Sequence, residues 1–399
     1  MSSLRMARWA ALGALAWAAG AAAARSGEGA DRVEIKLPHK GQVFGEGPEW
    51  DKQFAREALQ IFQDLKPDPA WVEKLKSLPD NTWMQCSPKG DQVAPTSRSE
   101  APMVYLSDFH ACMFASGCGD PGYSSDTWVY HTGANHWVQM WPNFVKCAEA
   151  PKLNKEPYPG DRPGTRCSFG LAYDSDRKRA VLRGGANAGQ AGKITWEYDP
   201  AVNKWEQTAP EKSGCDRYEA NCLGFAPGFG AVEVAGEGKA KAADTWVYKD
   251  KRWGKVATNG SPPPTMCSKL VWAAKPQRLI YWSGGALWAF DPKGLAWEDL
   301  SPKEGPSPAG FYRQGMDYDS ANDAVIMFGT KDEGDKLSQG PWVYSFEKKT
   351  WTDTKPAKGP WKGSGQSMFA AYDSEYNVLV IAGSGRGTWV YRYKQAPAK

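Results

Sequence analysis

Hydrophobic and polar positions alternate over short stretches along most of this chain, and turn-forming residues separate the stretches. Six stretches contain an aromatic dyad of the form Trp-x-aromatic. Residues two apart lie on the same face of a β-strand, so each dyad predicts a strand with a buried aromatic face. The dyads begin at Trp128, Trp196, Trp246, Trp288, Trp342 and Trp389.

A second tryptophan follows five of the six dyads after nine residues, or after seven in the third copy. Turn formers such as Asp199-Pro200 and Asp291-Pro292 stand between the dyad and this second tryptophan. Each unit therefore predicts a strand, a tight turn and a returning strand. The second tryptophans are Trp137, Trp205, Trp253, Trp297 and Trp351.

Another hairpin precedes most dyads. The clearest copy runs from Leu171 to Gly185, and residues 316–328 and 369–383 repeat it with a Tyr-Asp-Ser segment. We interpret the aspartate of that segment as a cap on the turn. Each repeat then contains four short antiparallel strands, and one such sheet cannot bury both of its faces. The repeats therefore predict an all-β, six-bladed β-propeller, in which neighbouring sheets cover one another.

These repeats resemble the kelch motif, in which a hydrophobic strand ends in Gly-Gly and is followed by a tyrosine and a tryptophan. The best copies are Gly184-Gly185 with Tyr198 and Trp205, and Gly284-Gly285 with Phe290 and Trp297. The other four repeats lack the intact glycine doublet. The resemblance covers residues 81–394 and implies a propeller similar to the central domain of galactose oxidase. It implies no single activity, because kelch propellers occur in both enzymes and binding proteins.

The sixth dyad, at Trp389, has no second tryptophan after it. Residues 81–88 read as the missing outer strand, with Trp83 in the place of the second tryptophan. Residues 204–210 of the second repeat have a similar sequence. We therefore expect an N-terminal strand to close the ring, which leaves no unpaired sheet edge at the seam.

Residues 1–24 are typical of a secretory signal peptide. Arg5 and Arg8 precede an uninterrupted run of apolar and small residues that ends in four alanines. An uncleaved membrane anchor is the alternative. The signal predicts export, to the periplasm or outside the cell, and no later segment is long and apolar enough to span a membrane.

Residues 25–80 predict a short helical arm that packs on the rim of the propeller. Apolar residues recur at helix-like intervals between Glu49 and Leu65, and Asp68-Pro69 matches the start of a second helix. A separate arm for docking a protein is the alternative. Residues 395–399 are expected to form a tail.

Composition adds two points. The chain has 20 Trp, 42 Gly and 29 Pro, which suits many short strands joined by tight loops. Its formal net charge is only +4 with both signs mixed, so nothing indicates a nucleic-acid partner.

An even number of cysteines in an exported protein predicts disulfides. Spacing suggests pairing Cys112 with Cys118, Cys147 with Cys167 and Cys215 with Cys222, which leaves Cys86 with Cys267. This is one of about 105 connectivities. A zinc site is the alternative, although no Cys-x2-Cys pair occurs.

The sequence contains no recognisable catalytic constellation. The resemblance to galactose oxidase raises a copper centre with two tyrosines, one of them crosslinked to a cysteine, and two histidines. Of the four histidines, His39 lies in the arm and His110, His131 and His136 all lie in the first blade. We expect no metal or cofactor, and we interpret His131 and His136 as exposed residues at a turn.

Basic residues near the inner strands are the candidate binding residues. Arg98, Arg166 and Arg313 precede three inner strands at similar offsets, Lys269 lies in a fourth, and Arg217 lies in a loop of the third blade. Guanidinium groups around the channel mouth would favour a carboxylate, a sulfate or an acidic sugar. Ion pairs with Glu100 or Asp317 are the alternative role.

Aromatic residues of the loops, such as Tyr158 and Phe225, could stack on a sugar ring. The sequence thus predicts a binding module for a glycan or an extracytoplasmic protein, acting through the loop-rich channel face. The alternatives are a scaffold in an envelope complex and a kelch-type enzyme, either a carbohydrate oxidase or a sugar-modifying enzyme, with its site at the channel mouth.

Overall fold

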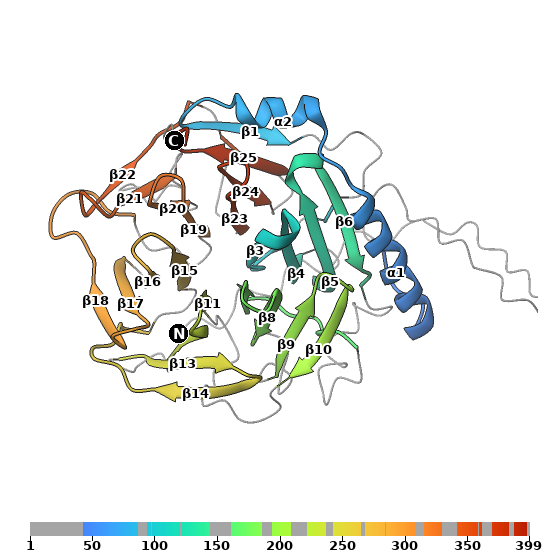
Figure 1. Cartoon of the computed structure of the whole chain (residues 1–399), viewed down its shortest axis with the longest axis horizontal. Coiled ribbons are helices and arrows are strands. Elements are labelled where there is room, and N and C mark those ends of the chain that lie inside the picture. The colour runs from blue at the N-terminus through green and yellow to red at the C-terminus, as the bar shows by residue number, and fades with distance from the viewer. Residues whose placement is uncertain are drawn as a thin grey trace, which may run out of the picture. The chain divides into compact units, whose positions relative to one another are not determined.

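Six antiparallel sheets surround a central axis in the described part of the chain (Figure 1), as the repeats predict. The structure is a computed structural model. It describes residues 43–86, 94–96, 98–119, 122–143, 161–185, 194–208, 222–236, 242–264, 268–283, 285–308, 315–328, 341–357, 359–360, 369–382 and 387–396. These residues all belong to one compact unit. The predicted signal peptide lies outside the described residues.

The sheets follow one another along the chain as blades one to six. Blade one contains β2 (Arg98–Ser99), β3 (Met103–Leu106), β4 (Ala111–Gly119), β5 (Gly122–His131) and β6 (His136–Trp141). Blade two contains β7 (Gly170–Asp174), β8 (Arg179–Arg183), β9 (Thr195–Asp199) and β10 (Lys204–Thr208). Blade three contains β11 (Leu223–Ala226), β12 (Gly230–Ala235), β13 (Asp244–Lys249) and β14 (Arg252–Val256).

The other three blades repeat this order. Blade four contains β15 (Lys269–Ala273), β16 (Arg278–Ser283), β17 (Ala286–Asp291) and β18 (Ala296–Asp299). Blade five contains β19 (Gly315–Asp319), β20 (Ala324–Phe328), β21 (Trp342–Ser345) and β22 (Thr350–Asp353). Blade six contains β23 (Phe369–Asp373), β24 (Val378–Ala382), β25 (Thr388–Arg392) and β1 (Thr82–Cys86).

The aromatic repeat is the core of each outer hairpin. In blade two, Tyr198 of the dyad pairs with Trp205 of the returning strand, and their ring centroids are 4.9 Å apart. Phe290 and Trp297 of blade four lie in the same register, 5.0 Å apart. Tilted aromatic contacts at this distance stabilise a cross-strand pair beyond the burial of its area.

Strand β1 closes the ring, as predicted. It pairs with β25 in the register of the other outer hairpins, so Trp83 lies opposite Tyr391 at a centroid distance of 4.7 Å. The hydroxyl of Tyr391 also donates to the Asn81 side chain at 2.7 Å. Asn81 thus replaces the turn asparagine of a continuous hairpin, such as Asn203, which accepts from Tyr198 at the same distance.

Hydrogen bonds from the second tryptophans join neighbouring blades. The indole of Trp205 donates to the Thr127 hydroxyl of blade one at 3.0 Å, and the indole of Trp297 donates to Thr245 of blade three at 2.9 Å. Trp253 and Trp137 make the same contact with Thr195 and Thr388. In each case the acceptor is the residue just before a dyad.

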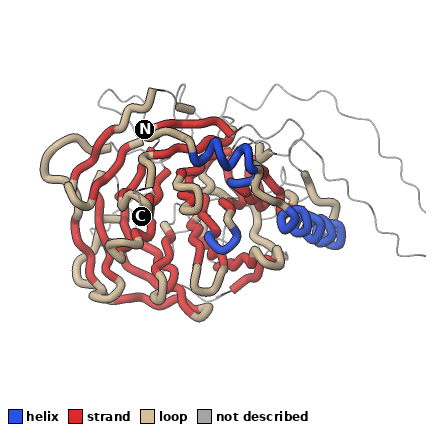
Figure 2. Tube along the Cα trace, turned by 45° about the horizontal axis from the view of Figure 1, so that its top comes forward, coloured by secondary structure: helices blue, strands red, loops and turns tan. Residues whose placement is uncertain are grey.

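The two α-helices of the described residues lie outside the strands at the rim (Figure 1 and Figure 2). Helix α1 (Pro48–Asp64) packs on β6, and its Asp51 forms a buried ion pair with Arg162 at 2.7 Å. Helix α2 (Pro69–Lys76) begins as predicted, because Asp68 accepts from the amides of Ala70 and Trp71. The Arg392 guanidinium donates to the carbonyl of Leu75 at 2.6 Å, which joins this helix to β25. None of the helices described is both long and apolar enough to cross a membrane.

Candidate functional site

The six inner strands surround a cavity on the propeller axis, which we call the channel cavity. Strands β3, β7, β11, β15, β19 and β23 each contact the next around the ring, and β23 contacts β3. Residues of all six strands line this cavity, whose volume is about 450 Å³. Small-molecule sites have cavities of this size, so the channel cavity is the candidate site.

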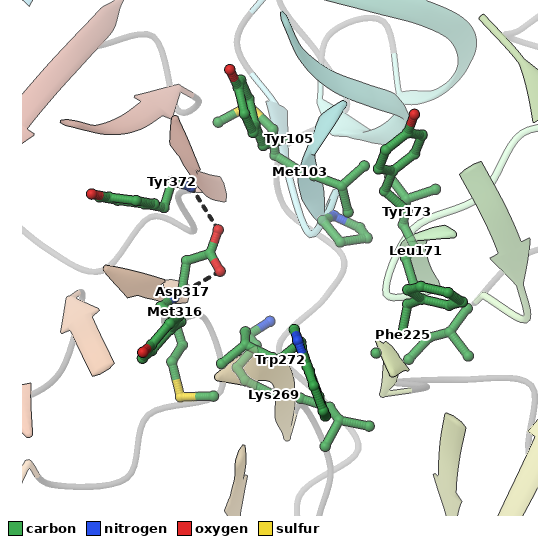
Figure 3. Close-up of a pocket in the computed structure, with 18 of the residues that line it drawn as sticks. Met103, Tyr105, Leu171, Tyr173, Phe225, Lys269, Trp272, Met316, Asp317 and Tyr372 are labelled. Atoms are coloured by element: carbon green, nitrogen blue, oxygen red, sulfur yellow. Dashed lines mark hydrogen bonds between the residues drawn. The ribbon is translucent and has the colours of Figure 1, made fainter. Parts of the chain in front are cut away.

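Aromatic and apolar side chains form most of its wall (Figure 3). Tyr105, Tyr173 and Trp272 come from three different blades and are half-buried, so part of each side chain is exposed. The Tyr173 hydroxyl donates to Asp108 at 2.8 Å, which fixes the direction of the ring. Met103, Leu171, Phe225 and Met316 complete the apolar wall.

One basic side chain and one carboxylic acid interrupt this wall. Lys269 contributes an amine at the start of β15, and Asp317 contributes a carboxylate from β19. One oxygen of Asp317 accepts from the amide of Tyr318 at 2.8 Å, and the other accepts from the amide of Tyr372 at 2.6 Å. Asp317 therefore also joins blade five to blade six.

Burial raises the pKa of Asp317 to about 6, although both backbone amides favour its charged form and lower the value. The folded protein therefore holds this proton more tightly than the unfolded chain, in which the pKa is about 3.8. The stabilisation is complete below about pH 4 and is lost as the pH rises through about 6.

Between about pH 4 and pH 6, we therefore expect the unfolding free energy of Asp317→Asn to fall less steeply with rising pH than that of the wild type. The asparagine cannot accept from both amides, so the variant is also less stable at every pH. Urea denaturation across this range measures both effects. Asp244→Asn, at an exposed carboxylate, should keep the wild-type slope. An unchanged slope in Asp317→Asn would contradict the assignment.

Two of the predicted binding arginines lie inside the protein. Arg98 is 2% exposed and pairs with Asp126 through both terminal nitrogens, one of them at 3.0 Å. Arg166 is 1% exposed and donates to the carbonyl of Gly184 at 2.9 Å. Arg98 therefore forms an internal ion pair, which was the alternative role, but its partner is Asp126 and not Glu100 or Asp317. We do not include either arginine in the candidate site.

The close approach of two backbone segments explains why glycine stands at position 185 of the Gly184-Gly185 doublet. Gly185 has φ of +114°, and a Cβ atom there would lie 3.0 Å from the carbonyl of Cys167. The doublet therefore lets the backbone pass close to the segment that carries Arg166 and Cys167.

Of the other predicted residues, Lys269 and Phe225 line the channel cavity. Arg217, Arg313 and Tyr158 lie outside the described residues. Sequence reasoning missed Tyr105, Tyr173 and Trp272, and it named Asp317 only as a partner for an arginine. An aromatic residue near the end of an inner strand was the available signal, because β3, β7 and β15 all carry one.

No protein-family model matches this chain, and no curated protein is significantly similar to it. The candidate site therefore rests on its own geometry.

The predicted cysteine pairing of Cys112 with Cys118 is wrong. Both residues lie in β4, six positions apart, which places them roughly 20 Å from one another along an extended strand. A disulfide needs Cα atoms within about 7 Å. The other three suggested pairs involve Cys147, Cys215 and Cys267, which lie outside the described residues. No disulfide forms among the cysteines that the structure describes.

His131 lies at a turn as expected, but the expectation that it is exposed is wrong. His131 is only 9% exposed, and its Nδ1 accepts from the amide of Ala134 at 3.1 Å. Burial lowers its pKa, so the neutral ring that this contact needs is favoured.

The interpretation of the Tyr-Asp-Ser aspartates as turn caps is confirmed. Asp319 and Asp373 each accept from two amides of the turn that follows them.

Proposed function

We propose that this protein is an exported binding module whose channel cavity takes an acidic glycan. The observation that supports this most directly is the wall of the cavity, which combines three half-buried aromatic side chains with one amine and one carboxylate. The signal-like residues 1–24 support export.

The chemistry of a sugar suits this wall. The faces of a pyranose ring carry C–H groups that pack on aromatic rings, and Tyr105, Tyr173 and Trp272 offer such rings on different sides. A few polar groups in a mostly apolar cavity then fix the orientation of the ligand. The Lys269 ammonium can pair with a carboxylate or sulfate of the sugar, and the Asp317 carboxylate can accept from a hydroxyl.

Glycan-array binding followed by calorimetry on the best ligand tests this proposal. We expect Lys269→Ala to weaken binding by about 10-fold or more, since a hydrogen bond to a charged group contributes about 1.5–3 kcal/mol. Trp272→Ala should weaken it by about 2- to 10-fold, since an aromatic contact contributes about 0.5–1.5 kcal/mol. Phe44→Ala and Lys255→Ala are matched controls on the outer surface, and both should bind like the wild type. Unchanged affinity in both cavity variants would overturn the proposal.

A second candidate function rests on Asp317. A carboxyl group with a pKa of about 6 in a cavity is suited to transfer protons near neutral pH, as a sugar-modifying enzyme requires. Incubation of the bound glycan with the protein, followed by mass spectrometry of the glycan, separates the two functions. A product that forms with the wild type and not with Asp317→Asn would make the protein an enzyme.

A further inference from the structure

Two cysteines and a glutamate gather at the junction of blades one and two. Cys118 lies near the end of β4, Cys167 lies three residues before β7, and Glu100 lies between β2 and β3. Their sulfur and carboxylate donor atoms all lie within 4.8 Å of one another. We propose that Glu100, Cys118 and Cys167 bind a divalent transition-metal ion such as Zn²⁺.

The donor set suits this ion. Zinc binds thiolate sulfur at about 2.3 Å and carboxylate oxygen at about 2.0–2.2 Å in a tetrahedral arrangement, which places neighbouring donors roughly 3.6–3.8 Å apart. Donors that already lie within 4.8 Å need to move by only about 1 Å to reach it. The three described donors would leave the fourth position to water or to another ligand.

The backbone around these donors is tied together by short hydrogen bonds. The amide of Gly117 donates to the carbonyl of Arg166 at 2.8 Å, and the amide of Ser168 donates to the carbonyl of Glu100 at 2.7 Å. Cys118 is also opposite Ser99 in the pairing of β2 with β4. All three segments are therefore fixed relative to one another before an ion arrives.

One further feature favours a metal over a simple thiol pair. The Ser168 hydroxyl donates to Oε2 of Glu100 at 2.8 Å, the type of outer hydrogen bond that orients a ligating carboxylate.

The ion would connect two blades next to the channel cavity. Ala101, which follows Glu100, and Phe169, two residues after Cys167, both line that cavity. A bound ion would add a second link, beside these backbone hydrogen bonds, between two segments of the cavity wall. The metal site is therefore separate from the proposed glycan site but adjoins it. Metal binding to the folded protein would also raise its thermal stability.

Titration of the reduced, metal-free full chain with Zn²⁺ and with Co²⁺ tests the proposal. We expect one equivalent to bind, a raised melting temperature, and a thiolate-to-cobalt charge-transfer band in the near ultraviolet. Cys118→Ser and Cys167→Ser should each weaken the band, and the double variant should show none. Ser168→Ala should weaken binding by about 10- to 100-fold. Cys222→Ser, at a buried cysteine of blade three, is the matched control and should bind normally.

Two results would overturn it. One is the absence of stoichiometric binding to the reduced wild type, which needs no variant and so does not depend on how the variants fold. The other is a Cys118–Cys167 disulfide, mapped by peptide mass spectrometry in protein purified without reductant, because a disulfide removes both thiolates. Neither result bears on glycan binding, so this proposal and the proposed function fail separately.

Discussion

Replacing Trp83 by alanine is expected to lower the free energy of unfolding by about 3–5 kcal/mol. This side chain is 6% exposed and packs with residues of blades five and six, among them Ile326 and Tyr391. Its removal leaves a cavity at the one blade whose outer strand comes from the other end of the chain. Urea denaturation of the full chain measures the loss.

Trp205→Ala is the matched control, because Trp205 occupies the equivalent position in a hairpin with a continuous turn. Both variants should lose a similar amount of stability. Only Trp83→Ala should also speed hydrogen exchange throughout β1 and β25, because no covalent turn holds these two strands together. Equal rates of hydrogen exchange in the two variants would show that the pairing of β1 with β25 does not hold the ring closed.

The second large effect is expected from Arg98→Met, which should lower the free energy of unfolding by about 3–5 kcal/mol. The substitution removes the cation that pairs with Asp126 in a site where both side chains are 0% exposed. Asp126 also accepts from the indole of Trp128 at 2.7 Å and from the Asn143 amide at 3.2 Å. These two neutral donors cannot replace a charged partner.

Two further variants make this prediction specific. Arg179→Met breaks a partly exposed ion pair with Asp199, and the loss of stability there should stay below about 1 kcal/mol. The double variant Arg98→Met with Asp126→Leu should recover much of the lost stability, because it removes both buried charges. A small effect of Arg98→Met on stability, together with weaker glycan binding, would instead support the channel-mouth role expected from the sequence.

The fold could be predicted because its determinants are local and repeated. A strand that carries Trp-x-Tyr, a turn and a returning tryptophan buries the same aromatic pair in each copy, as Tyr198 with Trp205 and Tyr344 with Trp351 show. The closing strand was equally predictable, since Asn81 and Trp83 repeat the spacing of Asn203 and Trp205. Neither inference required knowledge of distant contacts.

The site was less predictable because it depends on which blades face one another. The sequence places Arg98 near an inner strand but does not show that Asp126, 28 residues away, receives its guanidinium. Cys118 and Cys167 are likewise brought together by the packing of blade two on blade one, and spacing alone suggested other partners. Lys269 was found because it lies in an inner strand itself.

The closing of the ring by β1 also sets an order of events during synthesis. Asn81 and Tyr391, which hydrogen-bond at the seam, are 310 positions apart in the chain. At translation rates of about 5–20 residues per second, β1 emerges on the order of 15–60 s before its partner strand exists. Throughout that interval β1 is a strand with open edges, the kind of segment that pairs with other chains. During synthesis, β1 must therefore be kept from pairing with other chains until β25 has been made.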